Sequence, residues 1–191
     1  RFNRERLYIV PTLQNYIQTA PERIRYEMAL ATRNNLVFCV KFEGEPTWWN
    51  KNESLMPTVR NVPLWVLQET TKNFLGNVET CLQSKELKAG SLIIIGTHNQ
   101  DTIEEVKKIV LKNPTKMHGL YAQLLGLADH LTIQLKRQGY PVYKYLPYGP
   151  TSTMVPYLIR RAQELSQMKY PLTLQYDLIK SEFRHRFGLD S

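Results

Sequence analysis

Arg160 and Arg161 stand side by side in this sequence and are its best candidates for binding a small anion. Two guanidinium groups present forks of N–H donors that match both oxygens of one carboxylate. A short apolar segment ending near Tyr145 precedes them, and Glu164 follows one helical turn after Arg160. These residues predict a site for a small carboxylate. The alternative is a solvated helix face, on which Arg160 and Glu164 form an ion pair worth roughly a few tenths of a kcal/mol.

Apolar segments and amphipathic helices alternate along the chain, and this order must position the arginines. The helices are predicted at residues 21–34, 64–82, 101–111, 125–138 and 151–167, with a further short helix within 174–187. The apolar segments are typical of buried strands and lie at residues 7–12, 36–42, 91–96, 118–122 and 141–146. Such alternation predicts a parallel sheet built from βα units.

The number of predicted strands limits the fold. No G-x-G-x-x-G motif opens a helix, which disfavours a dinucleotide-binding open sheet. A complete (βα) barrel has eight strands, and this sequence predicts about five. We therefore expect an α/β fold with about five parallel strands and flanking helices. It would be an open sheet or part of a TIM-type barrel that another chain or a further segment completes.

Composition is that of an ordinary folded domain. The chain has 191 residues, of which 42% are hydrophobic and 22% charged. No apolar run reaches the roughly 18 residues that span a bilayer, and we expect no signal peptide. Cys39 and Cys81 are the only cysteines and form no C-x-x-C motif. We therefore expect a reducing compartment and no disulfide framework.

The formal net charge of +8 permits several partners. The plainest interpretation is a solvated basic surface, although a positive field also favours an anionic substrate, a phosphorylated cofactor, RNA or anionic lipid. The sequence has no block of five Lys or Arg residues and no aromatic RNA-binding signature. Nucleic acid is therefore disfavoured as a partner.

Polar side chains stand near the ends of the predicted strands, where ligands gather in βα folds. Gln14, Lys41 and Gln123 are such residues. Each has a structural alternative: Gln14 as the cap of a turn, for example, and Gln123 as a satisfied core amide. Likewise, Tyr145 could be a strand aromatic with a solvated hydroxyl.

Thr97, His98 and Asn99 precede a predicted helix and also allow two interpretations. The N-terminus of a helix attracts phosphate, so the segment could bind a phosphorylated or adenine-bearing cofactor. Alternatively, Asn99 is simply a good N-cap residue. A metal site is not predicted, because no cluster of His, Cys or carboxylate residues has ligand spacing.

Four segments resemble the C-terminal part of the proline dehydrogenase family. They are Tyr121–Asp129, Gly139–Gly149, Pro156–Glu164 and Gly96–Thr102. With residues 12–16, the resemblance covers about residues 7–167, which we take as a half barrel, leaving residues 168–191 as a helical tail. The resemblance implies a flavin-bearing βα barrel that oxidises L-proline to pyrroline-5-carboxylate on FAD. It also implies that electrons pass to quinone at the mitochondrial inner membrane or its bacterial counterpart.

The resemblance also implies roles for individual residues. Arg160 and Arg161 would bind the proline carboxylate, Tyr145 would pack on the proline ring, and Glu164 would support the arginines. The remaining assignments concern FAD: the isoalloxazine would contact Gln14, Gln123 and Leu125, and the adenosine half would contact Thr97, His98 and Asn99. Lys41 would match the lysine of a flavin-wrapping strand.

The sequence departs from the family pattern after Lys41. The family motif is of the type Lys-Leu-Val-Arg-Gly-Ala-Tyr, whereas this chain reads Lys41-Phe-Glu-Gly-Glu-Pro-Thr47, which brings Glu43 and Glu45 near an anionic cofactor. Residues 63–68 lack the threonine that the family offers to the FAD phosphates. The resemblance starts at what would be the fourth strand of the family's barrel.

Three hypotheses follow from the resemblance and these departures. The chain could be part of a split or multichain proline dehydrogenase that binds FAD. It could instead be a degenerate relative that has lost FAD and serves as a structural subunit of a mitochondrial complex. An unrelated βα binding module is the third. Because a five-stranded sheet leaves two unpaired edges, we expect another protein chain to cover them. We expect the protein in the mitochondrial matrix or peripherally on the matrix face of the inner membrane.

Overall fold

The computed structural model describes residues 3–5, 9–44, 67–113, 118–167, 180, 183–184 and 186–188. The chain divides into two compact units, Arg1–Pro147 and Tyr148–Ser191. The first unit contains the whole described sheet, and the second contains one long helix. Residues 45–66 lie outside the described residues, as does most of the helix predicted within 174–187. The division of the chain at residue 167 stays a prediction.

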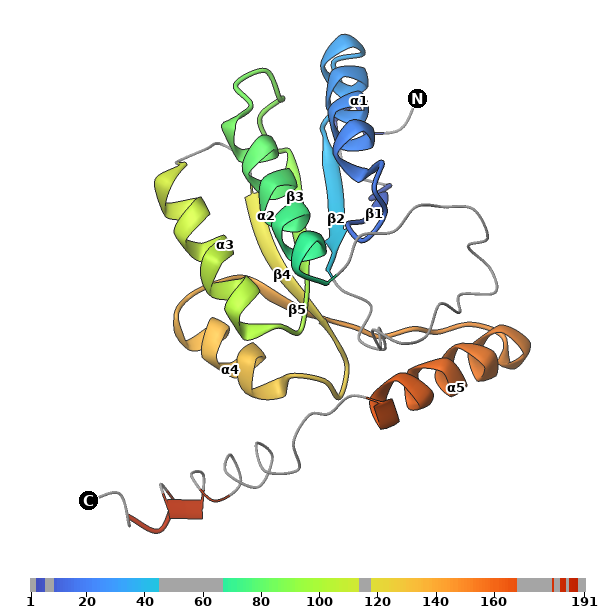
Figure 1. Ribbon diagram of the computed structural model, residues 1–191, viewed down its shortest axis with the longest axis vertical. Helices are drawn as coiled ribbons and strands as arrows, with labels where there is room; N and C mark the ends of the chain where they lie inside the picture. Colours follow the sequence, from blue (N-terminus) through green and yellow to red (C-terminus); the bar gives the residue numbers. More distant parts are fainter. Residues whose placement is uncertain are drawn as a thin grey trace. The chain divides into compact units, whose positions relative to one another are not determined.

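The first unit is built on one parallel five-stranded sheet (Figure 1). Its strands lie side by side in chain order, and each pairs in parallel with the next. They are β1 (Thr12–Gln14), β2 (Cys39–Glu43), β3 (Leu92–Gly96), β4 (His118–Leu124) and β5 (Val142–Tyr145). The helices between them are α1 (Ala20–Arg33), α2 (Leu67–Gln83), α3 (Gln100–Lys112) and α4 (Asp129–Arg137). The predicted α/β fold of about five parallel strands with flanking helices is confirmed.

Two predicted starts, those of the first strand and of the helix after β4, differ from the structure by more than three residues. The first strand is predicted at residues 7–12 but runs from Thr12 to Gln14. Before it, the carbonyl oxygen of Pro11 accepts a hydrogen bond from the amide of Lys41. Proline has no N–H to give to a sheet, so regular pairing begins after it. The helix predicted from residue 125 begins instead at Asp129. Gly126 and Ala128 take left-handed conformations, with φ of 81° and 50°, and form a turn before the helix.

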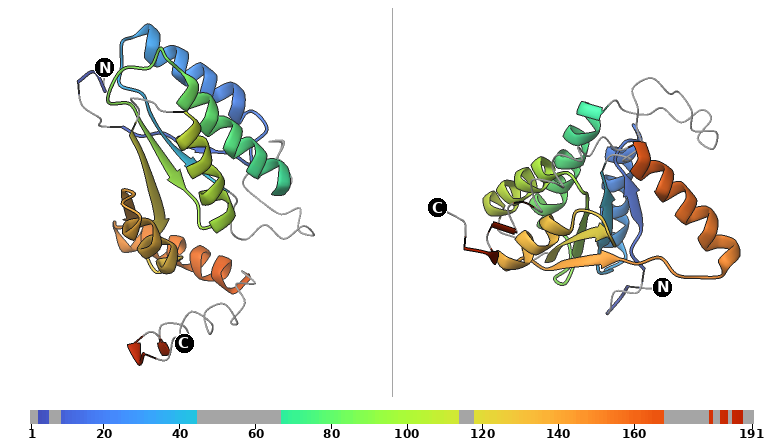
Figure 2. Two further views of the ribbon diagram at one scale, coloured as in Figure 1. Left: turned by 90° about the vertical axis from the view of Figure 1, so that its left-hand side faces the viewer. Right: turned by 90° about the horizontal axis from the view of Figure 1, so that it is seen from below.

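The hydrophobic core lies between the sheet and helices α1 to α4. One register row crosses the sheet through Leu13, Phe42, Ile95 and Tyr121, and each of these side chains is at most 3% exposed. Alternate residues of a strand point to opposite faces, so this row defines the helix-covered face (Figure 2). The helices contribute Ile24, Phe74, Val78, Ile103, Val106, Leu131 and Leu135 to the same cluster.

The other face of the sheet is more polar. Its register row runs through Gln14, Glu43, Gly96, Ala122 and Tyr143. We call the side chains of Gln14, Lys41, Glu43, Tyr143 and Tyr145 the polar face. β3 and β4 contribute only Gly96 and Ala122 to this row, so the row has small residues in its middle and long side chains on both sides.

Helix α5 (Thr151–Gln167) belongs to the second unit and confirms the predicted helix. Its first turn is closed by Thr153, whose hydroxyl donates a 2.9 Å hydrogen bond to the carbonyl oxygen of Pro150. Pro156 lies inside the helix and has no N–H for the helical ladder. Within the described residues, neither α5 nor any other helix has the length and apolar character needed to cross a membrane.

Candidate active site at the carboxyl ends of the strands

Lys41 and Tyr145 meet on the polar face. The Lys41 ammonium lies 5.2 Å from the centroid of the Tyr145 ring, within the range of a cation–π contact. Strands β3 and β4 lie between the two residues, a span of roughly 14 Å at ordinary strand spacing. Both side chains therefore extend over the strands between them. The structure thus brings together two residues that the sequence predicts for the site.

Gly96 makes this crossing possible. An added Cβ at Gly96 would lie 3.2 Å from Cε of Lys41 and 2.8 Å from the carbonyl oxygen of Phe42. A side chain at this position would collide with backbone and would also block the path of the lysine. The absence of a side chain at residue 96 therefore allows the lysine to lie over β3.

Glu43 neutralises Lys41 within the same strand. Its Oε1 accepts a 2.6 Å hydrogen bond from the Lys41 Nζ, and the Lys41 side chain is 22% exposed. The two residues are two positions apart and so share a face of β2. The resemblance implies that Glu43 lies near the cofactor, but this ion pair was not predicted, although the Lys-x-Glu spacing on a strand indicates it.

The segment after β3 is occupied by local contacts. The Asn99 side chain accepts a 3.1 Å hydrogen bond from the amide of Thr102 and caps α3, as its structural interpretation predicts. The Thr97 hydroxyl accepts a 3.1 Å hydrogen bond from the amide of Asn99. His98 Nε2 accepts a 3.1 Å hydrogen bond from the amide of Leu124. The assignment of these three residues to the adenosine half of a cofactor stays a prediction.

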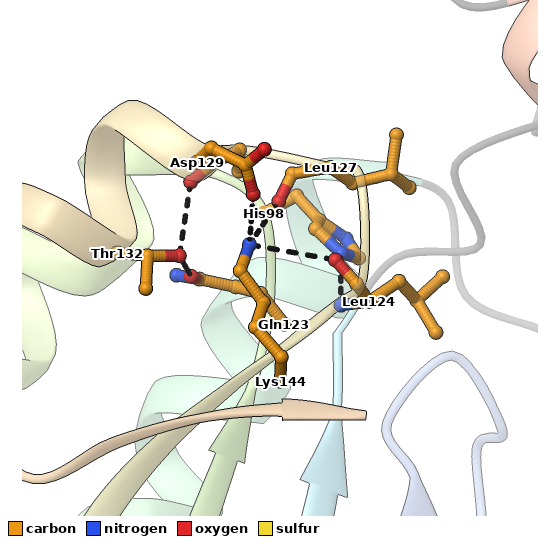
Figure 3. A network of polar contacts seen from close by, with 8 residues as sticks. His98, Gln123, Leu124, Leu127, Asp129, Thr132 and Lys144 are labelled. Atoms are coloured by element: carbon orange, nitrogen blue, oxygen red, sulfur yellow. Dashed lines mark hydrogen bonds and ion pairs between the residues drawn. The ribbon is translucent and has the colours of Figure 1, made fainter. Parts of the chain in front are cut away.

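A polar network surrounds the turn between β4 and α4 (Figure 3). Lys144 of β5 donates to the carbonyl oxygens of Leu124 and Leu127, at 3.4 and 2.6 Å, and forms a 2.7 Å ion pair with Asp129. His98, two residues after β3, contacts the same turn through the amide of Leu124. The strands on both sides of β4 therefore hold the turn that follows it. This role of Lys144 was not predicted from the sequence. The alternation of side chains along β5 indicates it, because Lys144 lies on the same face of the strand as Val142.

Gln123 lies apart from the polar face. It pairs in register with Lys144, and the Thr132 hydroxyl of α4 donates a hydrogen bond to its Oε1 (Figure 3). Its side chain therefore points to the helix-covered side, away from Gln14, Lys41 and Tyr145. Within the described part of the chain, Gln123 Nε2 is the only buried side-chain nitrogen or oxygen atom without a partner. Leu125 is 59% exposed in the turn.

The arginine pair cannot be joined to this geometry. Arg160, Arg161 and Glu164 lie in α5, in the second unit, and their side chains fall outside the described ones. The predicted meeting of Tyr145 with both arginines stays a prediction.

Metal and thiol chemistry find little support among the described residues. These residues contain no group of three His, Cys, Asp or Glu that could hold a metal ion. Cys39 and Cys81 are both buried and form no disulfide. Burial raises the pKa of the Cys39 thiol to about 11, against a lowering by the hydrogen bond from Asn3, and raises the pKa of Cys81 to about 12. Neither thiol is therefore an activated nucleophile.

Comparison with known proteins gives a consistent result. The family model described as proline dehydrogenase matches residues 2–169. The bovine (Bos taurus) mitochondrial proline dehydrogenase 1 is 28% identical over 97% of this chain and 31% of its own length. The bovine hydroxyproline dehydrogenase is 28% identical over 92% of this chain and 39% of its own length. The chain thus spans about a third of the length of these relatives.

A solved structure supports the fold. Proline utilization A (PutA) from Bdellovibrio bacteriovorus, inactivated by N-propargylglycine, matches 89% of this chain and 17% of its own chain. The TM-score is 0.67 and the sequence identity 18%, so this likeness concerns the fold, a (βα) barrel. Five sequential parallel strands with helices on one side are what a segment of such a barrel looks like. Taken with the match of the family model, these observations show that the chain belongs to the proline dehydrogenase family.

Proposed function

We propose that the protein oxidises L-proline to pyrroline-5-carboxylate with FAD as cofactor and passes the electrons to quinone. The observation that carries the proposal is the Lys41–Tyr145 contact across Gly96 on the polar face. This contact places a cation and an aromatic ring over the small residues Gly96 and Ala122. It lies at the carboxyl ends of parallel strands, where ligands bind in βα folds. A planar group and a small ring fit such a surface.

FAD, when bound, supplies the acceptor for the hydride that leaves the proline carbon next to nitrogen. Gln14 and Lys41 would hold its isoalloxazine, since both belong to the polar face. Ala122 beside Gly96 also has only a small side chain on this face. Gln123 faces the helix-covered side, so its unpaired Nε2 gives no support to a group bound on the polar face.

The side chains that would hold proline are those that the family resemblance implies. Tyr145 would pack on its ring, and Arg160 and Arg161 would pair with its carboxylate while Glu164 orients them. Because a bidentate guanidinium–carboxylate contact fixes orientation, this arrangement would set the reacting carbon relative to the flavin.

A flavin spectrum tests the proposal. Purified protein should show the visible absorbance of bound flavin, and this absorbance should bleach anaerobically with L-proline. Arg161→Met should abolish the bleaching and leave the bound flavin in place, whereas Arg137→Met on the exposed side of α4 should change neither. A protein that binds flavin but transfers no electrons from proline would contradict the proposed reaction. Running trans-4-hydroxy-L-proline in parallel would separate the two substrate types named among the relatives.

One set of observations favours a second candidate, a structural subunit derived from this family. Lys41 is already paired with Glu43, and Thr97 and Asn99 are engaged in capping α3. In that case FAD would be lost and the chain would act within a larger complex. Colourless protein of large assembled size would favour this candidate over the enzyme.

Both candidates share a partner and a location. β1 and β5 are the edges of the described sheet, and open edges of parallel sheets are normally covered. A further segment or another chain would pair with them in a split or multichain assembly. The mitochondrial names of several relatives favour the matrix or the matrix face of the inner membrane. A stable monodisperse monomer of this chain alone would exclude the partner.

A further inference from the structure

Lys144 is placed where an unengaged cation would be unfavourable. It lies beside the N-terminus of α4, and the partial positive charge there repels cations. The N-cap position is Ala128, which has no side-chain hydrogen bond to offer the helix. Asp129 at the start of the helix compensates by pairing with Lys144 at 2.7 Å. Helix stability alone therefore does not explain a lysine at this position.

The contacts of Lys144 point to the turn instead. An ammonium group has three N–H donors, and three acceptors surround this one: the carbonyls of Leu124 and Leu127, and the Asp129 carboxylate (Figure 3). The side chain is only 20% exposed, which strengthens charge-assisted hydrogen bonds relative to a fully solvated site. Lys144 therefore ties β5 to the beginning, middle and end of the turn.

The same turn also holds the backbone of Tyr145. The amide of Leu125 donates a 3.1 Å hydrogen bond to the carbonyl oxygen of Tyr145. On the opposite side, the amide of Leu124 donates to His98. A shift of the turn would therefore move the backbone of Tyr145, whose ring lies on the polar face beside Lys41.

We propose that Lys144 is a positioning residue for the ligand-binding face. It holds the Leu124–Asp129 turn against β5 and thereby sets the backbone, and so the ring, of Tyr145. Lys144 itself faces the helix side and acts only through Tyr145. This inference rests on the proposed function for its link to proline, but the arrangement of the turn can be measured without turnover.

The test compares Lys144→Met with Lys136→Met, an exposed lysine on α4 that serves as the control. Lys144→Met should speed hydrogen exchange of the Leu125 amide by about tenfold, because local opening of the turn becomes easier. It should raise the KM for L-proline by about tenfold with kcat within about threefold, since the ring of Tyr145 contributes to binding. Lys144→Arg should restore part of both effects, and Lys136→Met should show neither.

The outcomes separate the inference from the proposed function. If the wild-type protein oxidises no proline, the 19F resonance of 3-fluorotyrosine at position 145 takes the place of the KM. A shift of that resonance in Lys144→Met but not in Lys136→Met supports positioning, and an unchanged resonance overturns it. Faster exchange at Leu125 with an unchanged KM in an active enzyme also overturns it, because the lysine would then only stabilise the turn. If Lys144→Met does not fold, Lys144→Gln replaces it with the same expectations.

Discussion

The two faces of the sheet are made from the same strands but follow different rules. On the helix-covered face, Leu13, Phe42, Ile95 and Tyr121 form a continuous buried row. On the polar face, the neighbouring row has Glu43, Gly96 and Ala122 in place of large apolar side chains. The first row secures the fold through packing. The second row has small residues at its centre, which pack little, and long polar side chains toward its two edges.

This difference shows how a single strand serves stability and ligand binding together. In β2, Phe42 is fully buried, while Lys41 and Glu43 on either side of it point the other way and pair with each other. The alternation of side chains along a strand allows each face to change without disturbing the other. Substitutions on the two faces should therefore differ in kind as well as in size.

The largest effect is expected from Phe42→Ala. This ring is 0% exposed and packs edge-on against Phe74 at 5.9 Å between centroids. Removing it should lower the free energy of unfolding by about 3–5 kcal/mol, from lost burial and the cavity left behind. Urea denaturation would measure this. Tyr143→Ala is the control from the polar face, where the side chain is 60% exposed and the cost should stay below about 1 kcal/mol. Equal costs would contradict the contrast between the faces.

Gly96→Ala should follow in size. The new Cβ would lie 2.8 Å from the carbonyl oxygen of Phe42, so the strands must shift, at a cost of about 1–3 kcal/mol. Gly119→Ala on β4 is the matched control, because its Cβ would meet only Cγ1 of Ile93 at 3.9 Å. Thermal unfolding of the two variants gives the comparison. If Gly96→Ala is as stable as the wild type, the close approach of β2 and β3 does not require glycine at this position.

Glu43→Gln should change stability little and binding more. An ion pair this exposed contributes about 0–1 kcal/mol, so the melting temperature should hardly move. Removing the carboxylate leaves Lys41 with an unpaired charge, which should tighten binding of anionic FAD by roughly threefold to tenfold at low salt. Quenching of flavin fluorescence measures the affinity, and Glu86→Gln at an exposed site is the control. Unchanged or weaker affinity would show that Glu43 does not limit the charge available to a ligand.

The smallest expected effect is a change in the pKa of His130. Burial lowers this pKa from its usual value; the Asp129 carboxylate raises it and the Lys144 ammonium lowers it further. Because the folded pKa is below the unfolded value near 6.5, His130 favours folding above that pH. Its contribution falls as pH drops below about 6.5. Lys144→Met should raise the pKa of His130, which an NMR titration would follow. An unchanged pKa would show that the Lys144 ammonium does not act on His130.

Local sequence patterns were enough for much of the fold. The alternation of apolar segments and amphipathic helices predicted the five strands, and Asn99 before an acidic first turn predicted the cap of α3. Boundaries were less predictable where the backbone leaves its usual conformations. Ala128 has a positive φ, which an alanine does not indicate in a sequence, so the start of α4 was predicted too early.

The sequence by itself determined the order of elements, the family and the residues that stand at the strand ends, because these depend on neighbours along the chain. The tertiary structure decided which of those residues meet. Lys41 reaches Tyr145 across two strands, Glu43 takes up the charge of Lys41, and Gln123 turns toward α4 instead of the polar face. Such outcomes depend on strand register and on the absence of a side chain at Gly96, which only the folded sheet brings together.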